Sequence, residues 1–103
     1  MKRRVLYPSA PERHYTATLR RTMRLILAIH TIGQSVTPTV GSIRQYAGRA
    51  ARDVVEDLTD TEVITGLGSM RPREPVAATI AGARRRYAAN LRRDAVFAMT
   101  GRT

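Results

Sequence analysis

The chain has 103 residues and a formal net charge of +10, with 18 Lys or Arg residues against eight Asp or Glu residues. This length fits one domain with one modest core. The sequence contains no cysteine, which excludes disulfides, thiolate metal sites and cysteine nucleophiles. So strong a positive charge predicts a polyanionic partner, most often a nucleic acid.

The apolar runs are short, and residues 25–29 are typical of them. Such runs cannot cross a bilayer, and the basic opening of the chain lacks the apolar segment of a secretory signal. We therefore expect a cytoplasmic protein with no membrane partner, which would be nucleoid-associated if it binds DNA.

The N-terminal part of the chain predicts an arm followed by a helix. Residues 1–14 combine Lys2, Arg3 and Arg4 with turn-forming prolines, which is typical of a flexible basic arm. The remaining residues, 15–103, are predicted to form one domain. Its first helix runs from Thr16 to about Ile32 and ends at Gly33. The apolar stripe of this helix comprises Leu19, Met23, Ile26, Leu27 and His30, and the opposite face carries Arg20, Arg21 and Arg24.

Two short helices joined by a glycine are predicted next. Thr37 before Pro38 is typical of a helix start, and the first short helix continues from Pro38 or Thr39 to Ala47. Gly48 is expected to end it in a left-handed conformation. The second helix begins at Arg49, and its predicted buried stripe is Ala51, Val54, Val55 and Leu58. Two helices with a tight turn between them form a helix-turn-helix pattern.

A β-hairpin and a long helix complete the predicted order. The β-branched residues after Glu62 favour a strand at 62–67, followed by a basic loop at 68–74 and a strand at 75–79. Thr79 is a natural N-cap for a last helix over about 80–99. The predicted fold class is thus mainly α with a small β-hairpin.

This order of elements resembles the winged helix-turn-helix DNA-binding domain of small prokaryotic or phage transcription regulators, over roughly residues 18–90. "TVGSIRQYAG" resembles the first helix of the motif, and "GRAARDVVEDL" resembles its recognition helix. "VAATIAGARRR" is similar to the passage from the last strand into the final helix. The stretch "TDTEVI" departs from the family pattern, because it is shorter and more polar than the segment usual after the recognition helix.

The resemblance implies sequence-specific binding of double-stranded DNA by a transcription regulator, with repression as the working expectation. A recognition helix at about 49–59 would enter the major groove, and a basic wing at about 64–79 would contact the backbone or minor groove. Arg49 and Arg52 would contact base edges, since arginine can bind guanine in a bidentate manner. The other candidate DNA-binding residues are Thr39, Arg44, Arg20, Arg21 and Arg24 on the helices and Arg71 and Arg73 in the wing.

Five of the eight acids gather in ten residues, namely Asp53, Glu56, Asp57, Asp60 and Glu62. If the recognition helix enters DNA end-on, this acidic block would point away from the phosphates. The block could instead be a solvated face, or it could pair with the run Arg84–Arg86. Two other functions stay open: a winged-helix protein-interaction module, and a non-specific nucleic-acid-binding architectural protein.

No enzyme, cofactor or metal site is predicted, because His14 and His30 lack acidic neighbours at ligand spacing and no serine has a plausible base nearby. Whether a small-molecule effector exists, and which one, is not readable from the sequence. The stripe of the last helix continues through Ala95, Ala98 and Met99, further than a small core requires. We therefore expect a homodimer formed through the C-terminal helix.

Overall fold

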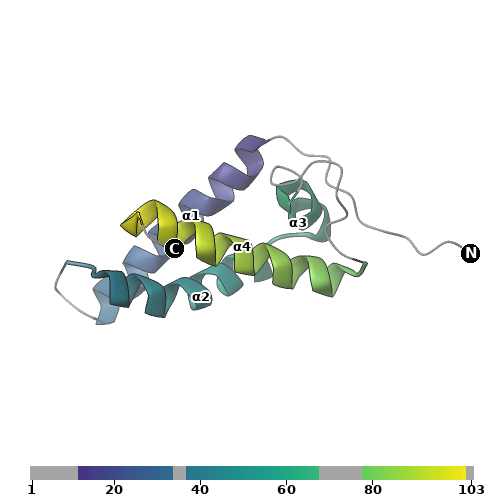
Figure 1. Ribbon diagram of the computed structural model, residues 1–103. Coiled ribbons are helices and arrows are strands. Elements are labelled where there is room, and N and C mark those ends of the chain that lie inside the picture. The colour runs from purple at the N-terminus through teal and green to yellow at the C-terminus, as the bar shows by residue number, and fades with distance from the viewer. Residues whose placement is uncertain (1–11, 34–36, 68–77, 102–103) are drawn as a thin grey trace, which may run out of the picture.

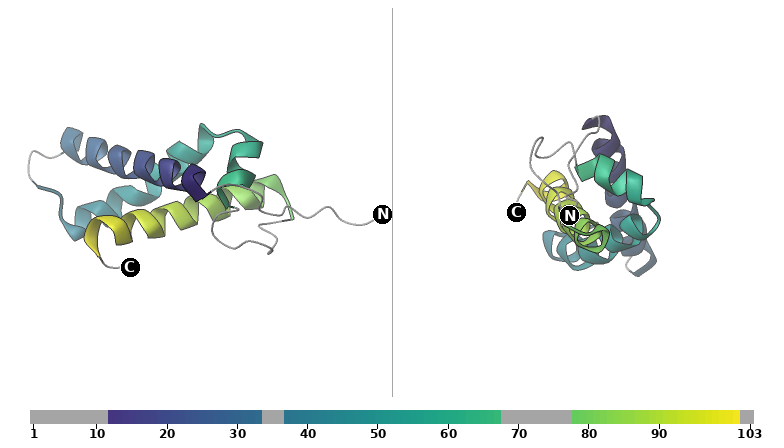
Figure 2. Two further views of the ribbon diagram at one scale, coloured as in Figure 1. Left: turned by 90° about the horizontal axis from the view of Figure 1, so that it is seen from above. Right: turned by 90° about the vertical axis from the view of Figure 1, so that its right-hand side faces the viewer.

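A computed structural model of the chain describes residues 12–33, 37–67 and 78–101. These residues form four helices: α1 (Glu12–Gly33), α2 (Val40–Glu56), α3 (Asp60–Leu67) and α4 (Ile80–Thr100) (Figure 1). α2 packs against both α1 and α4, α1 also contacts α4, and α3 packs on α1 and α4. Figure 2 shows that α1 and α4 run in the same direction, and that α3 lies beside the end of the bundle where both of them begin.

The helix-turn-helix prediction is wrong, because α2 is one helix that continues through Gly48. Gly101 is the one glycine with a positive φ among the described residues, so Gly48 does not adopt the expected left-handed conformation. The buried positions Ile43, Ala47, Ala50 and Val54 stay in one helical phase on both sides of the glycine. Burial of this continuous stripe outweighs the cost of a glycine inside a helix, which is about 1 kcal/mol relative to alanine.

The N-terminus of α2 is capped by Thr39, two residues later than predicted. The Thr39 hydroxyl accepts a hydrogen bond from the Ser42 amide at 3.1 Å, and the Ser42 hydroxyl accepts one from the Thr39 amide at 2.9 Å. This reciprocal capping box satisfies two amides that a helix start leaves without partners. Thr39, which was a candidate for DNA contact, thus serves as the N-cap of α2.

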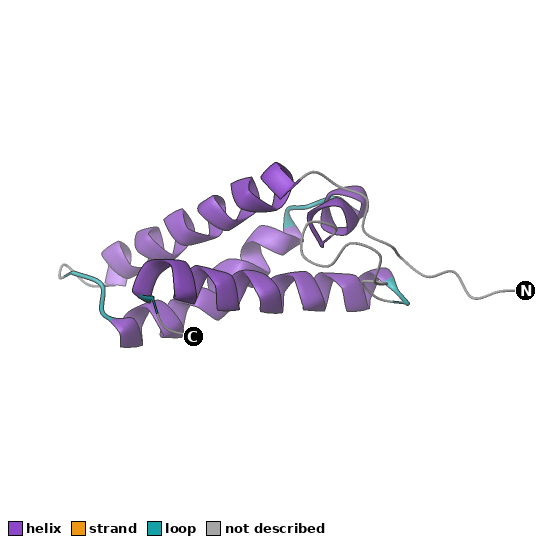
Figure 3. Ribbon diagram, turned by 45° about the horizontal axis from the view of Figure 1, so that its top comes forward, coloured by secondary structure: helices purple, strands orange, loops and turns teal. Residues whose placement is uncertain are grey.

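The predicted strand at 62–67 is also wrong, because these residues belong to α3. The Thr59 amide donates to the Glu62 carboxylate at 2.9 Å, and the Glu62 amide donates to the Thr59 hydroxyl at 3.2 Å. This second capping box starts a helix whose residues Val63 and Leu67, four apart, are buried. No strand occurs in residues 12–33, 37–67 or 78–101 (Figure 3). The predicted loop 68–74 and the first residues of the second strand, 75–77, lie outside the described residues.

The fold is therefore mainly α, as predicted, but the β-hairpin and the winged helix-turn-helix architecture are contradicted. The first and last helices agree with prediction more closely. α1 ends at Gly33 as expected, and it begins at Glu12, within the predicted arm. α4 is capped by Thr79, whose hydroxyl accepts from the Gly82 amide at 3.0 Å, and Gly101 ends it with φ of 71°.

The core consists of two clusters along the bundle. One surrounds Tyr87, which is fully buried and lies 5.7 Å, between ring centroids, from Tyr15. The Tyr15 hydroxyl donates to the Asp94 carboxylate at 2.5 Å, which joins α1 to α4. Burial, followed by this hydrogen bond, raises the pKa of Tyr15 above its ordinary value.

The second cluster includes residues of α4 that we expected to form a homodimer interface. Ala95 is fully buried in it, and Met99 packs against it, while Ala98 is exposed. The expected surplus of apolar surface on α4 is therefore smaller than the sequence indicated, and the homodimer stays a prediction. None of the described helices has the length and apolar character needed to cross a membrane.

Replacing Gly48 with alanine should stabilise the protein by about 0.5–1 kcal/mol, because alanine has a higher helix propensity. A Cβ atom at this position would lie 3.7 Å from Cδ of Arg92, an ordinary van der Waals contact. Urea unfolding followed by circular dichroism measures the change. A loss of stability in Gly48→Ala would instead support a left-handed turn at this position.

The same substitution at Gly66 should have the opposite effect. A Cβ atom there would overlap the buried Tyr87 ring, so either the ring or α3 must move. We expect Gly66→Ala to lower the free energy of unfolding by about 1–3 kcal/mol, the usual range for overpacking. The same unfolding experiment tests this, and unchanged or increased stability would contradict the close approach of α3 to Tyr87.

Candidate nucleic-acid interface

α2 carries opposite charges toward its two neighbours. Arg44, Gly48 and Arg52, spaced four residues apart, line a hollow between α2 and α4. Asp53 and Asp57, also four apart, line a different hollow between α2 and α1 together with Arg21 and Arg24. Residues four apart in a helix lie on the same side, so the basic row of α2 is turned toward α4 and the acidic row toward α1.

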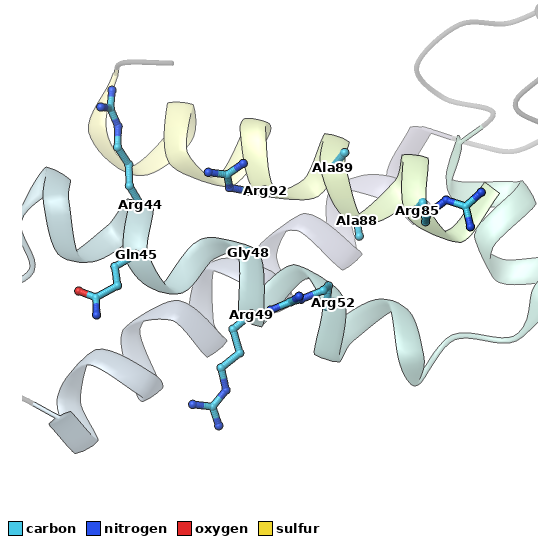
Figure 4. Close-up of a pocket in the computed structure, with 9 residues that line it drawn as sticks. All are labelled: Arg44, Gln45, Gly48, Arg49, Arg52, Arg85, Ala88, Ala89 and Arg92. Carbon is cyan, nitrogen blue, oxygen red and sulfur yellow. The ribbon is translucent and has the colours of Figure 1, made fainter. Parts of the chain in front are cut away.

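The hollow between α2 and α4, which we call the α2–α4 furrow, has a volume of 470 Å³. Five arginines line it, and no acid does so among the described residues. The lining comprises Arg44, Gln45, Gly48, Arg49 and Arg52 from α2 and Arg85, Ala88, Ala89 and Arg92 from α4 (Figure 4). In Figure 4, Gln45 and Arg49 extend away from α4, so they lie at the outer edge of the furrow.

Two rows of arginine therefore flank the furrow, Arg44 with Arg52 on α2 and Arg85 with Arg92 on α4. The members of each row are seven or eight residues apart, which in a helix corresponds to about 10–12 Å. Gly48, Ala88 and Ala89 lie between the rows. Their small side chains leave room for a ligand to approach the two helices.

The furrow continues along both helices. A smaller hollow shares Arg44, Ala89 and Arg92 with it and extends to Arg93 and Val96 near the C-terminal end of α4. Another shares Arg52, Arg85 and Ala88 and extends to Val55, Glu56 and Arg84. The surface is thus a continuous track between α2 and α4.

Three of the five arginines that line the furrow have no partner within the described part of the protein. Arg52, Arg85 and Arg92 form no ion pair or side-chain hydrogen bond with any residue in the described ranges. Arg21 instead pairs with Asp57 at 2.8 Å. Arg20 and Arg24 are exposed on α1 and do not line the furrow, and Arg24 shares a hollow with the two aspartates of α2.

Most of the acidic block is engaged within the protein. Asp57 pairs with Arg21, Asp60 pairs with Arg84 at 2.8 Å, and Asp53 lies 3.9 Å from Arg49. The carboxylate of Glu62 belongs to the capping box of α3. Hydrogen bonds from the Thr59 amide and hydroxyl hold the pKa of Glu62 below its ordinary value. The expected pairing with the run Arg84–Arg86 is thus seen for Asp60, whereas Asp57 and Asp53 pair with Arg21 and Arg49, which lie outside that run.

Arg84 has a structural task beside the furrow. Its guanidinium donates to the carbonyl oxygens of Val55 at 2.7 Å and Leu58 at 2.8 Å, and it also pairs with Asp60. The last carbonyls of a helix lack partners within the helix. The Val55 carbonyl accepts from the Leu58 amide at 3.1 Å as well, and Arg84 adds a second donor there and one to the Leu58 carbonyl. Arg84 thereby fixes the end of α2 and the start of α3 against α4.

Of the predicted site residues, the structure brings Arg44, Arg49 and Arg52 together with two arginines that the prediction missed, Arg85 and Arg92. The spacing of seven residues between these two was visible in the sequence, but their position opposite α2 depends on helix packing. Arg71 and Arg73 lie outside the described residues. Within the described ranges no group of three or more His, Asp or Glu side chains is placed to hold a metal ion.

Comparison of the chain with protein-family models, curated proteins and solved structures finds no match. We therefore infer a function from the geometry and charge of this surface.

Replacing Arg84 with methionine should lower the free energy of unfolding by about 1.5–3 kcal/mol, the range for hydrogen bonds to a charged group. Methionine keeps much of the side-chain length but cannot donate to Val55 and Leu58. The neighbouring Arg85→Met is a matched control, because Arg85 is exposed, and such substitutions usually change stability by less than about 0.5 kcal/mol. Equal effects of the two substitutions in chemical unfolding would rule out this role for Arg84.

Proposed function

We propose that this protein binds double-stranded DNA through its phosphate backbone, and that the α2–α4 furrow is the binding surface. The observation that carries the proposal is the double row of arginines around small residues, with no acid in the lining. Guanidinium groups pair with phosphate oxygens in a planar, often bidentate geometry. The net charge of +10 adds a long-range attraction for polyanions.

The absence of a stacking surface in the furrow favours a duplex over a single strand. Proteins that bind single strands usually stack the bases on aromatic side chains. No aromatic residue lines the furrow in the described part of the chain. Tyr15 and Tyr87 are buried, and Tyr46 packs against the second core cluster. A basic surface without aromatic side chains for base stacking suits a duplex, because the bases of a duplex are already paired with each other.

The mode of binding differs from the one that the sequence predicted. A separate recognition helix would present its first residues, Arg49 and Arg52, to base edges. Both residues instead lie in the second half of α2, and the flank of that helix lies against α4. We therefore propose contacts to the backbone, with little dependence on base sequence. This proposal corresponds to the alternative of a non-specific nucleic-acid-binding architectural protein better than to a sequence-specific regulator.

The internal contacts of the acids weaken the case for the protein-interaction alternative. It depended on an acidic block available for a partner, and four of the five acids contact residues of this chain. Glu56 is the exception, because it forms no ion pair or side-chain hydrogen bond with any residue in the described ranges.

Fluorescence anisotropy with a labelled duplex of about 20 base pairs, at three salt concentrations, tests the proposal. Each phosphate contact contributes about −0.9 to the slope of log affinity against log salt. Arg52→Ala and Arg92→Ala should each weaken binding to any duplex and make this slope shallower by about 1. Arg24→Ala is the matched control, because it removes the same charge from an exposed position on α1.

Two further comparisons make the test decisive. Duplexes of unrelated sequence should bind alike, and a single strand of equal length should bind more weakly. Absence of duplex binding at low salt would refute the proposal. If Arg24→Ala weakens binding as much as Arg52→Ala does, the furrow is not the binding surface. A strong preference for one duplex sequence would instead indicate that the protein recognises base edges.

A further inference from the structure

Glu56 interrupts the basic lining at one end of the track between α2 and α4. It lies four residues after Arg52, so it follows that arginine along the same side of α2. Together with Arg52, Arg84 and Arg85 it lines the hollow that continues the furrow toward the C-terminus of α2. It is the one acid among the described residues that line the furrow and its two extensions.

The carboxylate of Glu56 also differs from the other acids of the block. It is exposed, and it forms no ion pair or side-chain hydrogen bond with any residue in the described ranges. Asp53, Asp57, Asp60 and Glu62 each have an arginine or a capping amide beside them. Glu56 therefore keeps its charge available to act on whatever occupies the track.

A carboxylate at this position opposes a phosphate that would otherwise be drawn to Arg85. Like charges repel over several ångströms in water, and salt screens them fully only beyond about 10 Å. The opposite end of the track carries Val96 and Arg93, which pairs with Asp94 at 3.1 Å, and no acid lines it in the described part of the chain. The electrostatic field along the furrow is thus asymmetric, favourable at the Arg44 and Arg92 end and weakened at the Arg85 end.

We infer that Glu56 ends the phosphate-binding track beyond Arg52, so that the DNA backbone is held along Arg44, Arg52 and Arg92 and is kept from Arg85. This inference rests on the proposed function, and it adds a residue that limits affinity and sets the extent of the contact. Arg85 lines the furrow in the same way as Arg92 does, yet the two arginines differ in their contribution to binding because Glu56 lies near one of them.

The test compares Glu56→Gln with Asp57→Asn in the anisotropy experiment with a duplex. Both substitutions remove one negative charge from neighbouring positions with little change of shape, but Asp57 lines the hollow on the α1 side. We expect Glu56→Gln to tighten binding about threefold to tenfold at low salt, by removal of one like charge. The salt slope should become steeper by about 0.9, the amount for one additional phosphate contact.

A second pair of variants locates the effect. In the wild-type background, Arg85→Ala should weaken binding less than Arg92→Ala, and in the Glu56→Gln background the two should weaken it equally. If Glu56→Gln and Asp57→Asn have the same effect, only net charge matters and the inference fails while the proposed function stands. If the wild-type protein binds no duplex, both fail.

Discussion

The structure depends on α2 continuing unbroken through Gly48. Its apolar stripe is long enough to pack against α1 and α4 together, and this packing outweighs the weak helix propensity of the glycine. A straight helix between two neighbours must turn one flank toward each of them. The two charged rows of α2 are thereby separated, with arginines toward α4 and aspartates toward α1. The basic furrow is a consequence of this one packing arrangement.

The separation also explains how a chain with so large a net charge holds five acids within ten residues. Asp57 and Asp60 pair with arginines of α1 and α4 and thereby join helices, and Glu62 caps the start of α3. Surface ion pairs contribute little stability individually. Their more important effect here is that the internal contacts keep these acids away from the furrow. The furrow therefore remains positive along most of its length.

Sequence periodicity predicted α4 well, because its amphipathic stripe follows a Thr N-cap. It predicted α1 less closely, because the helix begins at Glu12 and Leu27 of the expected buried stripe is exposed. The sequence prediction is wrong at two places where a local residue signal disagrees with the hydrophobic pattern of the longer segment. Gly48 was interpreted as a helix stop, although Ile43, Ala47, Ala50 and Val54 keep one phase across it. The β-branched residues after Glu62 were interpreted as a strand, although Thr59 and Glu62 have the spacing of a capping box. Arg44 and Arg52 were candidates from the sequence. Their partners Arg85 and Arg92 were not, because a contact between distant helices leaves no local signal.

The central claim is that a duplex occupies the side of α2 that faces α4. The most direct measurement is a nuclear magnetic resonance titration with a short duplex, observing the backbone amides and the arginine Nε–H groups. The account predicts that shifts concentrate at Arg44, Arg52 and Arg92, and that Arg21 and Arg24 change little. Shifts centred on α1, or spread evenly over all exposed arginines, would contradict it.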